Sequence, residues 1–179
     1  MPEPELDLAP DRHVYGAADA PVTLLEYGDL ECPYCRSAAP VLRRVVDASD
    51  GQVRLVWRHF PLFEVHPYAL TAALAVEAAG TQGLFWEMHA ELFAHQDRLT
   101  DDGLRAAAVR VGVDPELVTG AAAQRFAPAV QRDYTDGIAS GVRSTPTVFV
   151  NGVLFAHRVR AESLRAAIDG ALAARTAPR

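Results

Sequence analysis

The chain has 179 residues, of which 50% are hydrophobic and 22% charged, so it can bury a sizeable core and does not have the composition of a disordered protein. This length fits one domain, with room for an insertion. The formal net charge is −6 and no basic run exceeds Arg43-Arg44, which argues against a protein that binds nucleic acid or anionic membranes.

Targeting signals are absent from the printed sequence. Residues 1–11 are acidic and contain proline, without the basic and apolar regions of a secretory signal. No apolar run approaches the length of a membrane-spanning helix, so we expect no transmembrane segment. The sequence therefore predicts a cytoplasmic protein, or a periplasmic or extracytoplasmic one if a native leader has been removed.

The first third of the chain alternates between strand and helix patterns. Residues 1–20 have the pattern of an extended arm and loop. A run of Val, Thr, Leu and Tyr predicts a strand over 22–27. A helix is expected over 33–48, kinked at Pro40, and a second strand over 53–60.

The middle of the chain, from about residue 66 to residue 140, has apolar residues at helical spacing. Residues 69–77 and 85–93 are the clearest helices. Capping residues and a proline indicate three further helix starts, at Thr100, Asp114 and Pro128.

The C-terminal part returns to strands. A strand is predicted over 147–150, and Asn151-Gly152 is a type I′ turn signal that leads into a hairpin partner over 153–155. A last helix is expected over 161–174. The order β-α-β, helical block, β-β-α is that of a thioredoxin fold with helices inserted between its two halves.

The only two cysteines form the motif Cys32-Pro33-Tyr34-Cys35, where the first strand passes into a helix. This placement is typical of a thioredoxin-type redox motif, because one helical turn brings the sulfurs together and the helix N-terminus stabilises a thiolate. A zinc site needs about four ligands. The two cysteines could therefore bind a metal only if a second subunit supplied the remaining ligands.

The sequence resembles the DsbA family of thioredoxin-like disulfide oxidoreductases from Val22 to Leu172. The resemblance depends on three segments in the same order, 26–35, 82–89 and 141–152. It implies an α/β thioredoxin-like fold, with a central mixed β-sheet flanked by helices and an inserted all-helical subdomain. The expected division is 1–65 for the N-terminal arm and β-α-β half, 66–140 for the insertion and 141–179 for the β-β-α half.

The two cysteines have different expected roles. Cys32, at the helix N-terminus, should be the exposed thiol with a depressed pKa, and it should be the attacking group. Arg36 would add positive potential. Cys35 lies one turn deeper, so it should have the higher pKa and resolve the mixed disulfide.

Glu26 precedes Cys32 by six residues in an otherwise apolar strand. Burial would raise the pKa of its carboxyl and suit it to exchange a proton with Cys35. The DsbA family has an acidic residue at this position. The alternative is a solvent-facing residue, because Leu24, Glu26 and Gly28 share one face of the strand.

Two further parts of the expected site follow from the resemblance. The Thr145-Pro146 segment matches a substrate-binding loop that holds a cis-proline, although trans is the usual form of an X-Pro bond. An extended substrate would pair with the Thr145 backbone. Pro33 and Tyr34 would tune the redox potential. Pro-Tyr also occurs in glutaredoxins, and the family usually has His where this chain has Tyr34, so the direction of electron flow stays open.

Other polar residues are assigned to structure. The spacing of His89, Glu91 and His95 does not place all three on one helix face, so we assign them to packing and surface. His59 and His66 flank a strand end and a loop. Asp29 and Glu31 are expected in loop or capping positions.

The sequence thus predicts a thiol:disulfide oxidoreductase that exchanges disulfides with protein thiols or with a small thiol such as glutathione. It needs no metal or cofactor besides the Cys32–Cys35 disulfide. One alternative is a glutaredoxin-like reductase that uses glutathione. The other is a non-catalytic module that holds a metal or an iron–sulfur cluster on the cysteine pair.

Overall fold

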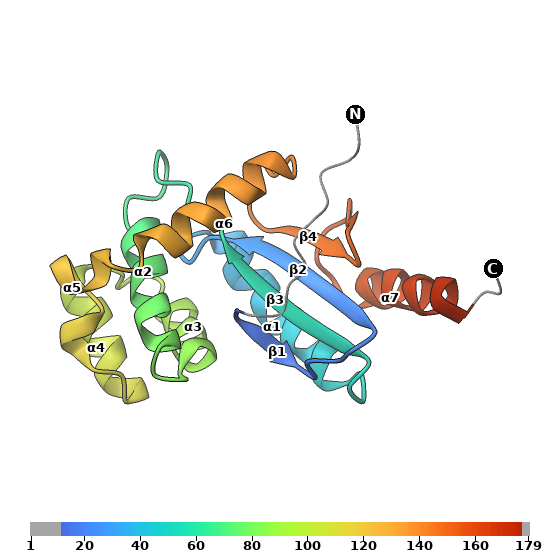
Figure 1. Ribbon diagram of the computed structural model, residues 1–179, viewed down its shortest axis with the longest axis horizontal. Coiled ribbons are helices and arrows are strands. Elements are labelled where there is room, and N and C mark those ends of the chain that lie inside the picture. Colours follow the sequence, from blue (N-terminus) through green and yellow to red (C-terminus); the bar gives the residue numbers. More distant parts are fainter. Residues whose placement is uncertain (1–11, 177–179) are drawn as a thin grey trace.

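The computed structural model of the chain describes residues 12–176 (Figure 1). Most of the arm expected over 1–20 therefore lies outside the described residues. The sheet has five strands in the order β1-β3-β2-β4-β5, and only β2 and β3 are parallel. The strands are β1 Val14–Gly16, β2 Val22–Gly28, β3 Val53–His59, β4 Thr147–Val150 and β5 Val153–Leu154. This mixed sheet and its flanking helices confirm the predicted thioredoxin-like fold.

The two faces of the sheet pack against different helices. Leu24 of β2 lies in a cluster with Leu42 of α1 (Pro33–Asp47) and Leu164 of α7 (Ala161–Thr176). On the other face, Leu25 clusters with residues that pack against Tyr134 of α6 (Ala127–Ala139). Because side chains alternate along a strand, Glu26 points to the same face as Leu24, toward α1.

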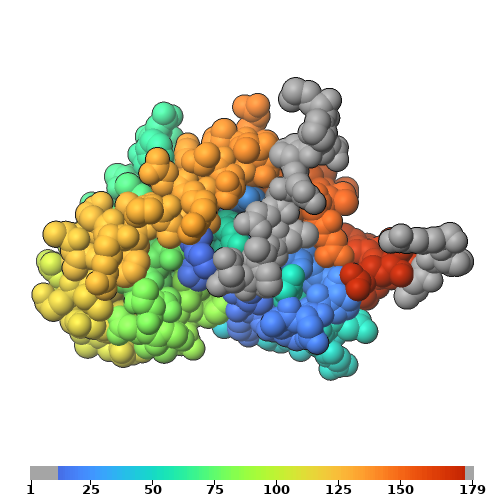
Figure 2. Space-filling model, viewed as in Figure 1, coloured from blue at the N-terminus to red at the C-terminus, as the bar shows by residue number. Residues whose placement is uncertain are grey.

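The helical insertion lies between β3 and β4. It contains α2 Ala69–Gly80, α3 Phe85–Ala94, α4 Asp101–Val111, the 3₁₀ turn η1 Pro115–Leu117, α5 Gly120–Gln124 and α6. Figure 1 shows α2 to α5 gathered beyond one end of the sheet, while α6 returns along the sheet face. Helices α2 to α5 form the green and yellow lobe of Figure 2.

Local structure differs from the sequence prediction at three short elements. β1 was expected to be loop, but its three residues pair antiparallel with β3. The helix expected at Asp114 is only η1, whose first amide is capped by the Asp114 carboxylate. The five-residue helix α5 was not predicted. The predicted hairpin turn is present, because Asn151 and Gly152 both have positive φ, as a type I′ turn requires.

One glycine beside the site is required by packing. A Cβ at Gly28, the last residue of β2, would lie 2.1 Å from the Trp57 ring. Trp57 is itself fully buried in the cluster that contains both cysteines. The bare backbone of Gly28 therefore allows the Trp57 ring to pack beneath the motif.

Candidate active site

The cysteine motif forms the first turn of α1. Cys32 is the N-cap residue with an extended backbone, and Pro33 occupies the first helical position, where it loses no hydrogen bond. The Cys32 amide donates to the Asp29 carbonyl at 3.1 Å, and the Arg36 amide donates to the Cys32 carbonyl at 3.1 Å. Both thiols are free. Local sequence thus places the two sulfurs on one turn.

Asp29 holds the loop in front of the motif. Its carboxylate accepts hydrogen bonds from the Glu31 amide at 2.7 Å and from the Leu62 amide at 2.8 Å. It also lies 2.8 Å from His66 Nδ1. Asp29 is therefore a buried anchor that ties the motif to the loop after β3, a more specific role than the expected loop or capping position.

Gln96, which follows α3, is a site residue that was not predicted from the sequence. Its side-chain amide donates to the Leu30 carbonyl at 2.9 Å and to the Cys32 carbonyl at 3.0 Å. These two bonds connect the helical insertion directly to the motif. A single glutamine in a loop carries no pattern that could reveal such a contact.

The expectation that Cys32 is exposed is wrong. Cys32 is 2% exposed, close to the fully buried Cys35. Its sulfur is covered by the loop before β4, where the Thr145 carbonyl oxygen lies 3.4 Å from Cys32 Sγ. Tyr34 between the cysteines is instead 71% exposed. An incoming substrate sulfur must therefore reach Cys32 beside the Thr145 loop and Tyr34.

The pKa of Cys32 is lowered to about 5. The largest cause is a hydrogen bond from the Cys35 side chain, and burial opposes it. Further stabilisation comes from the Thr145 side chain and from the backbone amides of Tyr34 and Cys35 at the helix N-terminus. The hydrogen-bond donors around the sulfur thus stabilise the thiolate by more than burial destabilises it.

Burial is the largest cause of the raised pKa values of Cys35 and Glu26. It raises the pKa of Cys35 well above its usual value, and the Glu26 charge raises it further. Burial likewise raises the pKa of the Glu26 carboxyl to about 8, with a contribution from the Cys32 charge. Glu26 is 0% exposed and neither of its oxygens has a hydrogen-bond partner. The solvent-facing alternative for Glu26 is therefore wrong.

The loop before β4 completes the site. The Thr145-Pro146 peptide bond is cis, as the resemblance implied. Thr147 pairs with Tyr27 of β2, which fixes the loop against the strand that leads into the motif. Cys32, Cys35, Glu26, Thr145 and Pro146, predicted from separate parts of the sequence, thus lie in one region of the structure.

A second buried cluster lies away from the thiols. The potential ligand atoms of His13, His59 and Glu77 lie within 4.8 Å of one another. Arg12 Nη2 is 2.6 Å from the Glu77 carboxylate, however, and His59 Nδ1 accepts from Trp57 Nε1 at 3.2 Å. His59 Nε2 therefore carries the ring proton and donates to Glu77 at 3.0 Å. The arrangement is an ion-pair network that joins the residues before β1 to β3 and α2, rather than a metal site.

The histidines and the glutamate assigned to structure at the end of α3 make packing and surface contacts. His89 is buried among aromatic rings, with Trp57 at 4.6 Å and Phe93 at 4.8 Å between centroids, and neither ring nitrogen has a hydrogen-bond partner. His95 pairs with Glu91 at 2.8 Å on the surface. These contacts place His89 in packing and the other two in a surface pair.

The family model described as Thioredoxin matches residues 8–170. The chain belongs to the thioredoxin family. Among the solved structures, this thioredoxin-family chain is similar to oxidised BdbD from Bacillus subtilis, with a TM-score of 0.79, 25% identity and coverage of 89% of this chain and 92% of that chain.

Two more solved structures lie above this level of identity. A thioredoxin-like oxidoreductase from Silicibacter pomeroyi has a TM-score of 0.77 and 31% identity, with 92% of each chain covered. DsbA2 from Pseudomonas aeruginosa has a TM-score of 0.65 and 30% identity over 88% of this chain and 92% of that chain. Together with the cysteine pair, these similarities place the chain among the DsbA-like thiol–disulfide oxidoreductases.

The curated relatives have a different description. A protein of Salinispora arenicola named Na(+)/H(+) antiporter NhaA 1 is 46% identical over 166 residues, which is 92% of this chain and 25% of that protein. The chain thus spans about a quarter of the length of the curated relatives that it matches. The matched quarter corresponds to the thioredoxin-family region of this chain. Within residues 12–176, no helix is long and apolar enough to cross a membrane.

Proposed function

We propose that the protein exchanges disulfides with protein thiols through Cys32, with no cofactor besides the Cys32–Cys35 pair. The observation that carries this proposal is the state of Cys32: its pKa is lowered to about 5 at the start of α1, beside the Thr145 carbonyl at 3.4 Å. A thiolate at neutral pH is the species that attacks a disulfide. The oxidoreductases of the same fold support this assignment.

Exchange proceeds in two displacements. In the reduced protein, the Cys32 thiolate attacks one sulfur of a substrate disulfide, forms a mixed disulfide and releases the other substrate sulfur as a thiolate. Cys35 then loses its proton and attacks the Cys32 sulfur. The Cys32–Cys35 disulfide forms and the second substrate thiolate leaves. Two electrons pass to the substrate, and oxidation of a substrate dithiol is the reverse sequence.

Glu26 is proposed to exchange the Cys35 proton. The pKa of Cys35 is raised well above its usual value, so it needs a base to become a nucleophile. The Glu26 carboxyl, with a pKa raised to about 8, can hold or release a proton near neutral pH. A buried carboxyl without a hydrogen-bond partner is otherwise destabilising, which supports a functional role.

The Thr145 segment is proposed to hold the substrate backbone. Thr145 lies beside the reactive sulfur, and the residue that follows it, Pro146, has no amide proton. An extended peptide placed next to Cys32 could pair with the Thr145 backbone, as in strand addition. Protein substrates fit this geometry, and glutathione, as a short peptide, is a proposed small-thiol partner.

Cysteine variants test the exchange. Cys35→Ser should form a mixed disulfide with a disulfide-containing test peptide and retain it, because the resolving thiol is gone. Cys32→Ser should form none, although it keeps one cysteine. A mixed disulfide on Cys35 in the Cys32→Ser variant, at the rate of the Cys35→Ser protein, would contradict the proposed order of attack.

The metal-binding alternative has a separate test. If the cysteine pair bridged two subunits through zinc or an iron–sulfur cluster, protein purified under reducing conditions would contain stoichiometric metal. We expect the metal content to be far below one atom per two chains and the visible spectrum to be flat. Stoichiometric metal would favour the binding module.

We also propose that this redox unit serves a sodium/proton antiporter. The support is the identity of 46% with part of an antiporter-named relative, whose matched quarter corresponds to this thioredoxin-family chain. The Cys35→Ser variant, co-expressed with a cysteine-containing antiporter of this type, should form a disulfide-linked complex that a reductant releases. The double Cys32→Ser/Cys35→Ser variant is the control, and equal recovery of a complex with it would contradict the proposal.

The predicted cytoplasmic location stays a prediction.

A further inference from the structure

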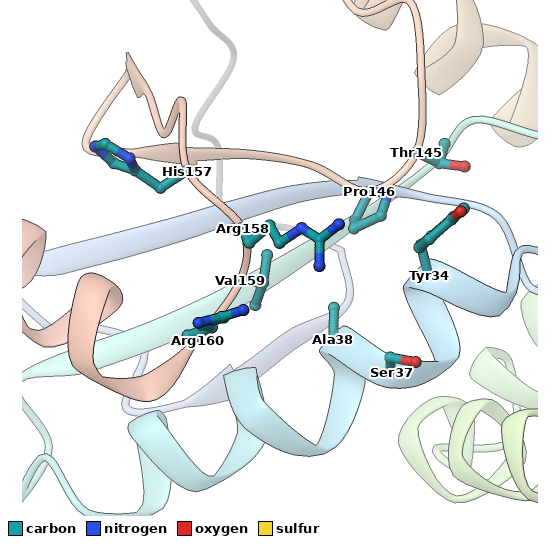
Figure 3. A pocket seen from close by; sticks show the side chains of 9 residues that line it. All are labelled: Tyr34, Ser37, Ala38, Thr145, Pro146, His157, Arg158, Val159 and Arg160. Atoms are coloured by element: carbon teal, nitrogen blue, oxygen red, sulfur yellow. The ribbon is translucent and has the colours of Figure 1, made fainter.

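A cavity of about 620 Å³ lies next to the cysteine motif and has Tyr34 and Thr145 in its lining. Three segments line it: the first turns of α1, the Thr145-Pro146 loop and the connection 157–160 between β5 and α7 (Figure 3). Thr145 connects the cavity to the reacting atom, because it lines the cavity and its carbonyl oxygen is 3.4 Å from Cys32 Sγ. A substrate joined to Cys32 would extend into it.

The connection between β5 and α7 directs two arginines to this cavity. Val159 packs on the core cluster between the sheet and α7, so its neighbours Arg158 and Arg160 lie on the outer side. Ser163 Oγ donates to the carbonyls of both arginines, each at 3.1 Å. The backbone is thus fixed while the guanidinium groups remain exposed.

The charge of the cavity is opposite to that of the whole chain. Figure 3 shows the Arg158 guanidinium pointing toward Pro146 and Ala38, while Arg160 lies below Val159 and farther from Pro146. None of the nine lining residues is acidic, and within residues 12–176 neither arginine forms an ion pair. The chain carries a net charge of −6, so these two unpaired cations make a local reversal of charge.

On the basis of the proposed thiol–disulfide exchange, we propose that Arg158 and Arg160 select protein substrates whose reacting cysteine lies next to acidic residues. The planar guanidinium binds a carboxylate through two parallel hydrogen bonds. Each residue of an extended peptide advances the chain by about 3.3–3.6 Å, so a segment of a few residues can follow the cavity from Cys32. Ala38, Pro146 and Val159 offer apolar surface to the carbon stems of such side chains.

The test uses three reduced peptides of equal length. Each contains the same two cysteines, and the flanking residues are all Glu, all Gln or all Lys. The second-order rate of reduction of the Cys32–Cys35 disulfide is measured in single-turnover mixing at low salt. We expect the Glu peptide to react on the order of 10-fold faster than the Gln peptide, the Lys peptide to be slowest, and the differences to shrink in 1 M salt.

Charge reversal identifies the residues responsible. Arg158→Glu and Arg160→Glu should each reduce the preference, and the double variant should favour the Lys peptide. Arg165→Glu makes the same charge change on an exposed residue of α7 outside this cavity, and it should preserve the wild-type ranking. The flanking residues also change the reactivity of the peptide thiols, but equally for every protein, so comparing the peptide ratio of each variant with that of the wild type cancels this effect.

The possible outcomes distinguish failure of the proposed substrate selection from failure of the proposed thiol–disulfide exchange. Ratios between the peptides that are the same in the wild type and the double variant, or that change equally in Arg165→Glu, would overturn the selection of acidic substrates while exchange itself stands. Failure of the wild-type protein to react with any peptide would reject the exchange function. Glutathione also carries carboxylates. If the double variant slowed glutathione alone and left the peptide ranking unchanged, the small thiol would replace the acidic protein segment as the ligand.

Discussion

Cys32 combines nearly complete burial with a weakly held proton. Burial alone would raise the pKa of a thiol, as it does for Cys35. At Cys32 the hydrogen bond from Cys35, the Thr145 side chain and the amides at the start of α1 reverse this effect. The same surroundings therefore lower the pKa of Cys32 and raise the pKa of Cys35. This difference suits Cys32 to attack first and Cys35 to resolve the mixed disulfide.

The pH dependence of alkylation should show this difference. Because the thiolate is the reacting species and the pKa of Cys32 is about 5, iodoacetamide labelling of Cys32 should reach half its maximum near pH 5. Cys35 should label far more slowly at every pH below 8. Cys35→Ala removes the main donor and should raise the midpoint by at least about one pH unit. A wild-type midpoint near 8 or 9 would show that the donors do not stabilise the thiolate.

Glu26 should reduce stability in a defined pH range. Its pKa is raised from 4.5 to about 8, so the folded protein keeps a proton that the unfolded chain releases. This penalty is absent below pH 4.5, grows as the pH rises, and is complete near pH 8. At pH 7 it amounts to about 3 kcal/mol, at roughly 1.4 kcal/mol for each pH unit above 4.5.

Glu26→Gln should therefore stabilise the protein by about 3 kcal/mol at pH 7 and by nearly nothing at pH 4. Urea unfolding at several pH values measures the difference. Glu64→Gln, in an exposed loop residue, is the control and should show no such trend. Exchange by Glu26→Gln should be slowed at the resolving step. An effect on stability that does not vary with pH would mean that the Glu26 carboxyl is ionised in the folded protein.

At the scale of elements, the parts of the site that the sequence predicted are those with local signals. Pro33 at the helix start and the apolar run before it located β2 and α1, and the resemblance located the Thr145 loop. β1, η1 and α5 have three, three and five residues, too few for a periodic pattern, and they depend on contacts with other elements.

The burial of Cys32 was missed for a related reason. The group that covers its sulfur is Thr145, 113 residues away along the chain, and the amide that holds its carbonyl belongs to Gln96, 64 residues away. Nothing in the spacing of the motif reports on either contact. Local pattern predicted the cysteine motif and Glu26, and the family resemblance predicted the Thr145 loop, whereas the contacts that cover Cys32 and hold its carbonyl depend on the tertiary fold.

The Gln96 contact makes the helical insertion part of the active site. Gln96→Ala would leave the carbonyls of Leu30 and Cys32 without these donors. We expect a loss of about 1–2 kcal/mol in the free energy of unfolding and slower exchange, because the turn that presents Cys32 is less restrained. Gln124→Ala, at an exposed position of α5, is the matched control for both measurements. Unchanged exchange in a destabilised Gln96→Ala protein would limit Gln96 to a structural role.

At the scale of the whole molecule, thiolate stability is linked to redox poise. The lowered pKa of Cys32 stabilises the reduced protein at any pH above about 5, and the disulfide form has no such thiolate. The acidic neighbours Asp29 and Glu31, and Tyr34 in place of the family's usual His, oppose an extreme oxidising potential. These effects together favour an oxidant of intermediate strength.

We therefore expect a midpoint potential of roughly −230 to −150 mV at pH 7, between about −270 mV for thioredoxin and about −120 mV for DsbA. Equilibration with a glutathione series measures it. The reduced form should melt at a higher temperature than the disulfide form at pH 7. Because the thiolate is lost as the pH falls through about 5, this difference in melting temperature should shrink toward pH 4. A midpoint at or below the thioredoxin value, with a disulfide form that melts higher, would instead identify a reductase of the glutaredoxin or thioredoxin type.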